Sequence, residues 1–471
     1  MAKFYITNAI PYVNASPHIG HALEFIQSDT VKRYHQLRGE EVLLLCGSDE
    51  NAVKNVQAAE AQGEEVQGFV DRHAKIFEEL ALKLNIKFDV FQKGSNSDHY
   101  KASQKLWELC NQSGDIYKKS YKGLYCVGCE LFYTKEELNE NGECFEHPGK
   151  ALEEIEEENY FFKLSKYQDQ LIQIIESGEY QIVPEFRKNE ILKFIKSGLN
   201  DFSISRSNAR AKNWGVPVPG DESQRIYVWF DALNIYQSGI GFESDEEKYH
   251  KWWPADLHVI GKGIIRFHAV YWPAILLSAG IPLPKKLFVH EYFTVDGQKM
   301  SKTLGNVYNP IPFLEKYGAD ALRYFCLAKI SPFQDGDFSE EKVIQAYNSD
   351  LANGLGNLAA RVAKLCEKSD FEAKEKISKL DPEVEKLLGE FKFNEALGWI
   401  WKIIQRADMR VNETQPWKLE GLELKEILDE LVSLILDVAY NLQPFLPETS
   451  EKILKQFSGK VTSQASLFPR I

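Results

Sequence analysis

The first 50 residues predict two apolar strands with an amphipathic helix between them, and this pattern constrains the fold more than any other feature. KFYITNAI at 3–10 is typical of a buried strand, and EEVLLLCGSDE at 40–50 predicts a second one. From His18 to Arg38 apolar residues recur at helical spacing, and Gly39 ends the helix. A strand, a helix and a strand form a βαβ unit with parallel strands. The sequence therefore predicts an α/β fold whose ligand site lies beyond the carboxyl ends of the strands.

The composition is that of a globular protein with more than one domain. Of 471 residues, 44% are hydrophobic and 27% are charged, and a single core rarely grows beyond about 300 residues. No apolar run approaches the roughly 20 residues that a membrane helix needs, so we expect no membrane association. Seven cysteines favour a reducing compartment, and the strand-like MAKFYITNAI suggests no targeting segment. We therefore expect a cytoplasmic protein, and the net charge of −13 argues mildly against one that coats nucleic acid.

Further along, the α/β pattern is interrupted and then gives way to helices. A cysteine cluster, an acidic run and amphipathic stretches precede a return of strand character in RIYVWFDALNIY and DLHVIGKG, followed by an apolar helix in IIRFHAVYWPAILLSAG. FVHEYFTVDGQKMSKTLGN predicts a hairpin around Asp296 and Gly297, with a lysine loop behind it. From about Glu340 onward nearly every segment is an amphipathic helix, which favours a helical bundle as the last domain.

The stretch NASPHIGHALE places His18 and His21 at the predicted start of the first helix. A helix that begins after Pro17 directs its unpaired N–H groups toward the crevice and attracts anions. Gly20 lets a phosphorylated ligand approach the backbone closely. Taken alone, the two histidines could equally be polar residues at a helix mouth. A metal pair is disfavoured, because histidine ligands on a helix usually stand four residues apart.

The second candidate element is KMSKT at 299–303, in which Lys299 and Lys302 are mobile point charges suited to a triphosphate. Taken alone, such a loop is usually a solvated surface stretch. Its occurrence near the end of an α/β domain that begins with H-I-G-H makes a shared phosphate site the better interpretation.

A third motif predicts a metal. Cys126, Cys129, Cys144 and His147 form C-x2-C-x14-C-x2-H, a spacing typical of one tetrahedral, structural Zn²⁺ with four protein ligands. The alternative is four unlinked residues in a loop. Bound zinc would stabilise a small insertion that has little core of its own. The remaining cysteines are expected to be buried or incidental thiols, namely Cys46, Cys110, Cys326 and Cys366.

Together these motifs resemble the HIGH and KMSKS signatures of the class I aminoacyl-tRNA synthetases, and within that class the chain is similar to the methionyl-tRNA synthetases. The resemblance runs from about Phe4 to about Gln443 and rests on AIPYVNASPHIGH, YCVGCE, YVWFDAL, FHAVYWPA, KMSKT, NLAARV and NETQPW. Each segment is weak or moderate alone, but the ordered set is highly specific. It implies a Rossmann-like catalytic domain with a zinc-knuckle insertion and a helical anticodon-binding domain. The predicted parts are the first catalytic half at 1–116, the insertion at 117–223, the second half at 224–290, a linking region with the lysine loop at 291–340 and the helical domain at 341–471.

The resemblance implies a two-step ligase reaction without a covalent nucleophile on the protein. The carboxylate of methionine attacks the α-phosphate of ATP, which gives methionyl adenylate and pyrophosphate, and the terminal adenosine of tRNA(Met) then attacks the adenylate. His18 and His21 would act on the α-phosphate and adenine side, and the two lysines on the departing pyrophosphate, with Mg²⁺ on the phosphates. The catalytic residues implied are His18, His21, Lys299 and Lys302, and the ATP-binding set adds Gly20, Ser301 and Thr303.

The resemblance also implies a methionine pocket. Asp49 follows the second strand and would pair with the α-ammonium group; as a bare residue it would be a helix N-cap. Aromatic walls suit a flexible thioether, and apolar shape alone discriminates against leucine by only about 1–3 kcal/mol. We therefore expect a hydrogen bond to sulfur from Tyr12 or His268. The pocket positions are Ile10, Tyr12, Asp49, Trp229, Ala232, Leu233, Tyr236, Ile264 and His268; without the family, Trp229 and Tyr236 would be core residues.

In the helical domain, Asn357, Arg361 and Trp417 match positions that the family uses to bind the CAU anticodon. Loop bases that splay out can stack on an aromatic ring and hydrogen-bond at their edges. As bare residues they would form a polar helix face and a core tryptophan. The chain departs from the family at Gly263, where many members carry Asp, and at Thr303, which keeps the usual hydroxyl. We expect a monomer.

Three alternatives remain open. Another class I synthetase is possible, although the insertion is too short for an editing domain and the zinc site looks closed, unlike that of a cysteine enzyme. A small-molecule nucleotidylyltransferase shares H-x-G-H but has no use for an anticodon domain. A non-catalytic tRNA-binding relative would not be expected to keep both histidines and both lysines.

Overall fold

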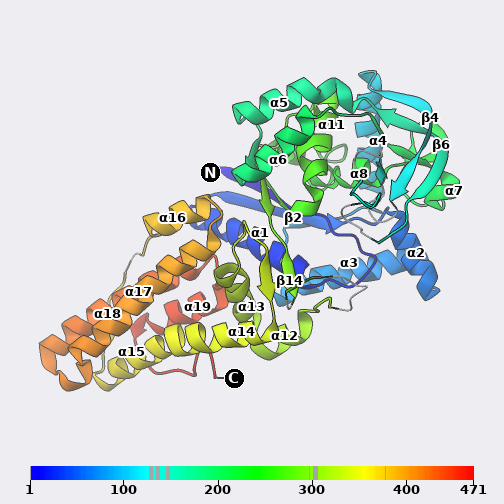
Figure 1. Ribbon diagram of the computed structural model, residues 1–471. Helices are drawn as coiled ribbons and strands as arrows, with labels where there is room; N and C mark the ends of the chain where they lie inside the picture. Colours follow the sequence, from blue (N-terminus) through cyan, green and yellow to red (C-terminus); the bar gives the residue numbers. More distant parts are fainter. Residues whose placement is uncertain are drawn as a thin grey trace.

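The computed structural model describes residues 2–126, 131–133, 138–144, 149–295, 297–300, 306–376 and 378–470, with the backbone alone at residues 131, 132 and 299. In this part of the chain a six-stranded parallel sheet forms the centre (Figure 1). Its strands in spatial order are β3 (Val90–Lys93), β2 (Glu41–Ser48), β1 (Lys3–Asn8), β12 (Leu257–Gly261), β13 (Lys286–His290) and β7 (Gln181–Val183). The predicted parallel α/β fold is confirmed.

Alternate residues of each strand point to opposite sides of the sheet, and both sides are buried in apolar cores. Ile6, Leu44 and Val259 belong to one apolar core, and Tyr5, Leu45 and Ile260 belong to the other. Helix α1 (Ile19–Leu37) connects β1 to β2, and Gly39 follows it with φ +78°. The predicted βαβ unit and its helix ends are confirmed. The other helices of this region are α2 (Val53–Gln62), α3 (Val66–Lys83), α4 (Ser97–Gln112) and α11 (Trp272–Ala279).

The segment 117–223 builds a second, antiparallel sheet but also extends the first. The acidic run at 153–158 lies in a long strand beside a lysine-bearing one, where Lys118 and Lys122 pair with Glu158 and Glu154 at 3.8 and 3.6 Å. Strand β7, from the same segment, pairs in parallel with β13. The insertion therefore shares an edge with the main sheet. Its elements are β4 (Ile116–Cys126), β5 (Leu131–Tyr133), β6 (Glu153–Phe162), α5 (Gln168–Ser177), α6 (Glu185–Lys196), β8 (Phe202–Ser203), β9 (Ser205–Ser207), α7 (Asn208–Ala211), β10 (Pro217–Val218) and β11 (Asp221–Ile226).

One strand prediction is wrong for most of its length. In RIYVWFDALNIY only the first residues belong to β11, and the rest forms the short helices α8 (Val228–Ala232) and α9 (Ile235–Ser238). Residues 226–242 are all buried. Apolar side chains therefore lie on all sides of these short helices, and the sequence shows no helical period. DLHVIGKG does form β12, and the apolar segment after it is helical, as predicted.

The predicted hairpin is confirmed by antiparallel pairing of β14 (Phe293–Val295) with β15 (Gln298–Lys299), with Gly297 at φ +74° in the turn; Asp296 lies outside the described residues. Strand β16 (Gly336–Phe338) pairs in parallel with β14. These strands make a small separate sheet that carries the start of the lysine loop. Helices α10 (Glu246–Trp252), α12 (Ile311–Tyr317) and α13 (Ala319–Tyr324) complete this half of the molecule.

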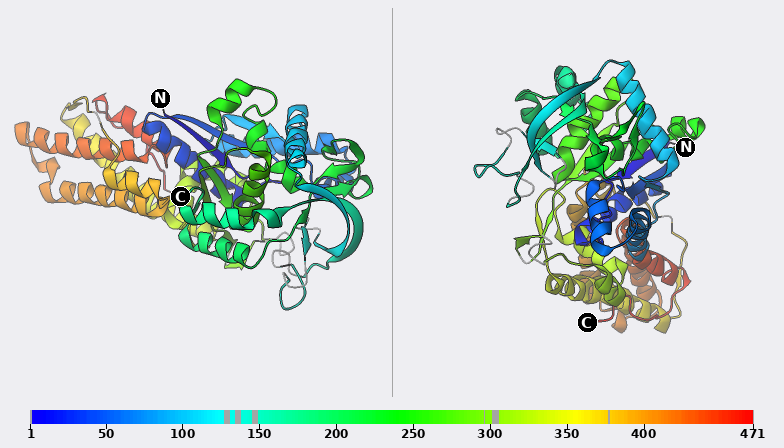
Figure 2. Two further views of the ribbon diagram at one scale, coloured as in Figure 1. Left: turned by 90° about the horizontal axis from the view of Figure 1, so that it is seen from above. Right: turned by 90° about the vertical axis from the view of Figure 1, so that its right-hand side faces the viewer.

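The C-terminal region is helical, as predicted, and extends from the sheet as an elongated arm (Figures 1 and 2). Its core is continuous with the core under α1, so the helices pack directly on the α/β part. The fully buried Arg323 fastens this contact, because it pairs with Asp29 of α1 at 2.7 Å and donates to the carbonyl of Phe445 at 2.8 Å. No described helix is long and apolar enough to cross a membrane. The helices are α14 (Glu340–Ala346), α15 (Asn357–Lys368), α16 (Pro382–Gly389), α17 (Phe393–Thr414), α18 (Gly421–Leu442) and α19 (Pro447–Gln456), with the short pair β17 (Glu372–Ala373) and β18 (Gly459–Lys460).

Candidate active site

The two histidines cap the helix whose N-terminus lies at the carboxyl edge of the sheet. The N–H of Gly20 donates to Nδ1 of His18, and the N–H of His18 donates to Nδ1 of His21, each at 3.1 Å. The rings stack with centroids 3.9 Å apart. Because Nδ1 accepts in both rings, the ring proton of each is on Nε2. The cap thus fixes which ring nitrogen carries the proton in each histidine, which the sequence could not show.

Gly20 is required by the same geometry. A Cβ at this position would lie 3.0 Å from Cε1 and 3.1 Å from Nδ1 of His18. A side chain would therefore displace the capping ring by a few tenths of an ångström.

Both ends of the lysine loop lie at this helix N-terminus. The N–H of Ile19 donates to the carbonyl of Tyr308 at 3.0 Å. On the other side, Cε of Met300 lies 3.5 Å from the place that a Cβ on Gly20 would take. Segments about 280 residues apart therefore meet at α1. Ser301, Lys302 and Thr303 lie outside the described residues, and Lys299 is described by its backbone alone.

A buried polar group that the sequence reasoning missed lies one turn along α1. Glu24 accepts from Nδ2 of Asn8 at 2.7 Å and pairs with Nε2 of His290 at 3.0 Å, and Ser28 donates to Asn8 at 2.7 Å. Asn8 and His290 are the last residues of β1 and β13. This group fixes α1 against both strand ends, and a polar residue at each strand end was the signal available in the sequence.

Several of the predicted methionine positions contact one another. Tyr12 and Asp49 form a parallel β-bridge, and Asp49 is 3% exposed. The Tyr12 ring meets Trp229 edge-on at 6.2 Å, and Trp229 stacks on Phe267 at 3.6 Å. The structure thus adds Phe267, which the sequence reasoning had left unassigned. Ala232 and Leu233 are buried, and Ile10 and Ile264 are half-buried.

The structure corrects the expectation for His268. Its Nδ1 lies 3.0 Å from the carbonyl of Ile264, which can only accept, so Nδ1 carries the proton. Its Nε2 lies 2.8 Å from the hydroxyl of Tyr236. Burial raises the pKa of Tyr236, so that hydroxyl stays protonated and donates. His268 therefore has no ring proton left for a sulfur atom, and of the two residues considered Tyr12 stays as the predicted donor.

Acid should destabilise the fold through His268. Burial lowers the pKa of its ring to about 4, from an ordinary 6.5. The unfolded chain then binds the proton more tightly, so this contribution to stability is complete above about pH 6.5 and lost as the pH falls to about 4, by roughly 3 kcal/mol. We expect His268→Gln to flatten the pH dependence of the unfolding free energy in urea over this window. An unchanged slope would contradict the prediction.

Gly263 and its neighbours form a turn at the end of β12. The N–H of Gly263 donates to the hydroxyl of Tyr292 at 2.7 Å. This contact joins the turn to the segment that leads into the hairpin.

The predicted zinc site is only partly described. Cys126 and Cys144 are both buried and share a small cluster with Tyr133. Cys129 and His147 lie outside the described residues. Among the residues that the structure describes, no group of three side chains could hold a metal ion. The other predicted thiols, Cys46, Cys110, Cys326 and Cys366, are buried as expected.

The three predicted anticodon residues lie in the helical arm. Asn357 is exposed at the start of α15, and Arg361 follows one turn later. Arg361 is fixed by Asp408 and Asn412 of α17, at 2.6 and 2.8 Å. Trp417 is 54% exposed, so the interpretation of it as a core residue is wrong.

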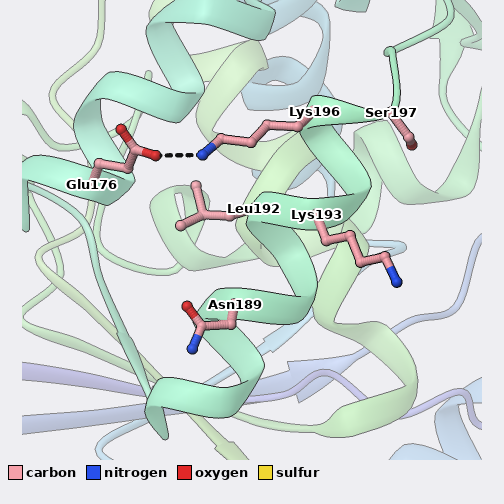
Figure 3. Close-up of a pocket in the computed structure, with 6 residues that line it drawn as sticks. All are labelled: Glu176, Asn189, Leu192, Lys193, Lys196 and Ser197. Carbon is pink, nitrogen blue, oxygen red and sulfur yellow. Dashed lines mark hydrogen bonds and ion pairs between the residues drawn. The ribbon is translucent and has the colours of Figure 1, made fainter.

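A surface pocket between α5 and α6 lies apart from all of these residues (Figure 3). Lys196 crosses it to pair with Glu176 at 2.6 Å. It contains none of the predicted site residues, and the candidate active site is instead the region around the N-terminus of α1.

Comparison with known proteins agrees with this fold. Residues 4–363 match the family described as tRNA synthetases class I (M). The chain therefore belongs to the class I aminoacyl-tRNA synthetases.

The similar proteins within that class are methionine enzymes. The methionine–tRNA ligase of Thermotoga maritima is 41% identical over 477 residues, which cover 97% of this chain and 75% of that one. The Mycobacterium tuberculosis methionyl-tRNA synthetase in complex with methionyl-adenylate superposes with a TM-score of 0.93 at 36% identity, over 100% of both chains. The free-state structure of that enzyme gives a TM-score of 0.85 at 33% identity, over 100% of this chain and 98% of that one.

Proposed function

We propose that this protein ligates methionine to tRNA(Met), through methionyl adenylate. The observation that carries the proposal is the meeting of Met300 and Tyr308, on either side of the lysine loop, with the N-terminus of α1. This contact brings Met300 and Tyr308 to the start of the helix that His18 and His21 cap. The methionyl-adenylate complex of the M. tuberculosis enzyme, with its TM-score of 0.93, supports the same activity.

The chemistry requires positioning and charge stabilisation. The carboxylate of methionine attacks the α-phosphorus, a new P–O bond forms, and the bond to the pyrophosphate oxygen breaks. The Nε2–H groups of His18 and His21 donate to the α-phosphate oxygens as negative charge develops. Lys299 and Lys302 neutralise the leaving pyrophosphate. Mg²⁺, bound by the ATP phosphates, supplies further positive charge.

Methionine is held at both ends. Asp49 pairs with the α-ammonium group, and the rings of Tyr12, Trp229 and Phe267 enclose the thioether. His268 and Tyr236 orient each other and close the far end of the pocket. Ile10, Ala232, Leu233 and Ile264 complete the apolar lining. Ser301 and Thr303 are proposed to contact ATP with Gly20.

The test is amino-acid-dependent exchange of pyrophosphate into ATP. We expect exchange with methionine and none with leucine, isoleucine, valine or cysteine. Lys302→Ala should lower the rate by roughly 10²–10³-fold, because it removes a donor to the departing group. Exchange with another amino acid would keep the class and reject the pocket. No exchange in the folded protein would reject catalysis and favour a tRNA-binding relative.

The helical arm is proposed to bind the CAU anticodon through Asn357, Arg361 and Trp417. A half-exposed tryptophan can stack a splayed base, and a guanidinium can hydrogen-bond to a base edge. Trp417→Ala should raise KM for tRNA(Met) by roughly 5- to 150-fold, since one base stack is worth about 1–3 kcal/mol. Pyrophosphate exchange, which needs no tRNA, should be unchanged. An equal effect on a transcript with another anticodon would contradict the assignment.

One structural Zn²⁺ is proposed at Cys126, Cys129, Cys144 and His147. The buried thiols of Cys126 and Cys144 support it, because thiolates are preferred zinc ligands and the small cluster around them has few apolar residues. We expect one zinc per chain by elemental analysis, and loss of that zinc in Cys129→Ser. We also propose that the protein is a cytoplasmic monomer. Its domains are proposed to have the boundaries 1–116, 117–223, 224–290, 291–340 and 341–471.

A further inference from the structure

Four charged side chains meet at the carboxyl edge of the main sheet, and the chemistry described above uses none of them. Lys262 is in the turn after β12, Glu291 follows β13, Asp335 precedes β16 and Arg187 is on α6. We call these residues the junction cluster. They come from three separate parts of the chain: the main sheet, the small sheet of the hairpin and the segment 117–223.

Lys262 is the centre of the cluster. Its Nζ lies 2.8 Å from Oε2 of Glu291 and 2.6 and 2.8 Å from the two carboxylate oxygens of Asp335. An ammonium group has three donors, and three carboxylate oxygens surround this one. Glu291 is only 7% exposed and also accepts from Nε of Arg187 at 2.9 Å. Without Lys262, two carboxylates would face each other in a partly dry site and repel.

One side of the cluster holds the hairpin. The N–H of Tyr292 donates to Asp335 at 2.9 Å, and the N–H of Gly336 donates to the carbonyl of Tyr292 at 3.0 Å. β14 begins directly after Tyr292 and β16 begins at Gly336, so these bonds fix the end of the small sheet. β15 of the same sheet ends at Lys299, where the lysine loop begins.

The other side of the cluster holds the turn formed by residues 262–264. We call it the methionine turn, because Ile264 belongs to the proposed methionine pocket. Lys262 and Ile264 bound one short 3₁₀ turn, whose middle residue, Gly263, donates to the hydroxyl of Tyr292. The carbonyl of Ile264 in turn orients His268. The cluster therefore lies between the proposed methionine pocket and the sheet that carries the lysine loop.

We propose that Lys262 is a positioning residue for adenylate formation, one that locks the hairpin of the lysine loop onto the methionine turn through Glu291 and Asp335. This inference rests on the proposed function. The lock sets the place from which Lys299 and Lys302 reach the triphosphate. It touches neither substrate.

Lys262→Met keeps the length of the side chain and removes its charge. We expect kcat for methionine-dependent exchange to fall by roughly 10- to 100-fold, because a shift of about 1 Å in a catalytic group has an effect of that size. KM for methionine should stay within about threefold, since the pocket walls are intact. Asp335→Asn should give the same pattern, and the double variant should lose little more than either single one. Lys262→Arg should restore most of the rate, because a guanidinium also bridges two carboxylates.

The chain offers a matched control at the opposite edge of the same two strands. Lys285 pairs with Asp256 at 2.6 Å, just before β13 and β12 begin. Lys285→Met removes an equivalent ion pair there and should leave exchange unchanged. A rise confined to KM for methionine, or no rescue by Lys262→Arg, would overturn the proposal.

Hydrogen exchange without substrates separates this inference from the function on which it rests. Amides of residues 293–299 should exchange faster in Lys262→Met than in the parent protein, and no faster in Lys285→Met. Equal protection in all three proteins would overturn the lock. The absence of methionine-dependent pyrophosphate exchange in the parent protein would reject the proposed function, whatever the protection of the hairpin amides.

Discussion

Replacing His18 by asparagine should lower kcat for methionine-dependent pyrophosphate exchange by roughly 10²–10³-fold while leaving the fold intact. Asparagine is among the best N-cap residues, so its side-chain oxygen can still accept from the N–H of Gly20. What is lost is the Nε2–H group that we propose as a donor to the α-phosphate. His18→Asn therefore separates the two roles that this ring combines in the structure.

The control is the same substitution at an exposed histidine. His250, whose side chain is 70% exposed on α10, should tolerate His250→Asn without effect on exchange or on the melting temperature. If His18→Asn lowers the rate by less than about threefold, the donor role is rejected. If it lowers the melting temperature as far as His18→Ala does, the asparagine does not preserve the cap, and His21→Gln becomes the deciding variant.

Replacing Asp49 by asparagine should raise the dissociation constant for methionine by roughly 150- to 4,000-fold, because breaking a buried charge pair costs about 3–5 kcal/mol. Asp49 is 3% exposed, so water cannot replace its charge on the α-ammonium group. The side-chain volume is nearly unchanged, and the rings around the thioether stay in place. Titration of methionine against the protein fluorescence measures the change.

A substrate analogue sharpens this test. The deaminated analogue of methionine lacks the α-ammonium group and should bind the parent protein much more weakly than methionine does. Asp49→Asn should remove most of that difference, because the group that recognises the ammonium is gone. An undiminished preference for methionine in the variant would show that another residue binds the ammonium. Asp98→Asn, at a 58% exposed carboxylate on α4, provides the control.

Several parts of this molecule could be predicted from the sequence because their determinants are local. The βαβ unit follows from two apolar strands and the helical period between them, and the structure confirms its parallel pairing. The N-terminus of α1 follows from Pro17, directly after which the helical pattern begins. The hairpin before the lysine loop follows from Gly297 in its turn. In each case the residues that decide the structure are within a few positions of each other.

Other features depend on residues that only the folded chain brings together. The helices α8 and α9 were missed because burial on all sides erases the apolar period. The edge strand β7 is set by its pairing with β13, about 100 residues away in the chain. The exposure of Trp417 depends on where the helices of the arm end, between α17 and α18.

The sequence by itself determined which chemical groups this protein can use: two histidines at a helix mouth, two lysines in a loop, and a carboxylate at a strand end. The tertiary structure decided how they act. It placed the ring protons on Nε2 of His18 and His21, engaged both nitrogens of His268 and joined Lys262 to Glu291 and Asp335. Proton position and charge pairing are set by the neighbours of each group in space, and those neighbours come from segments that the sequence separates by tens to hundreds of residues.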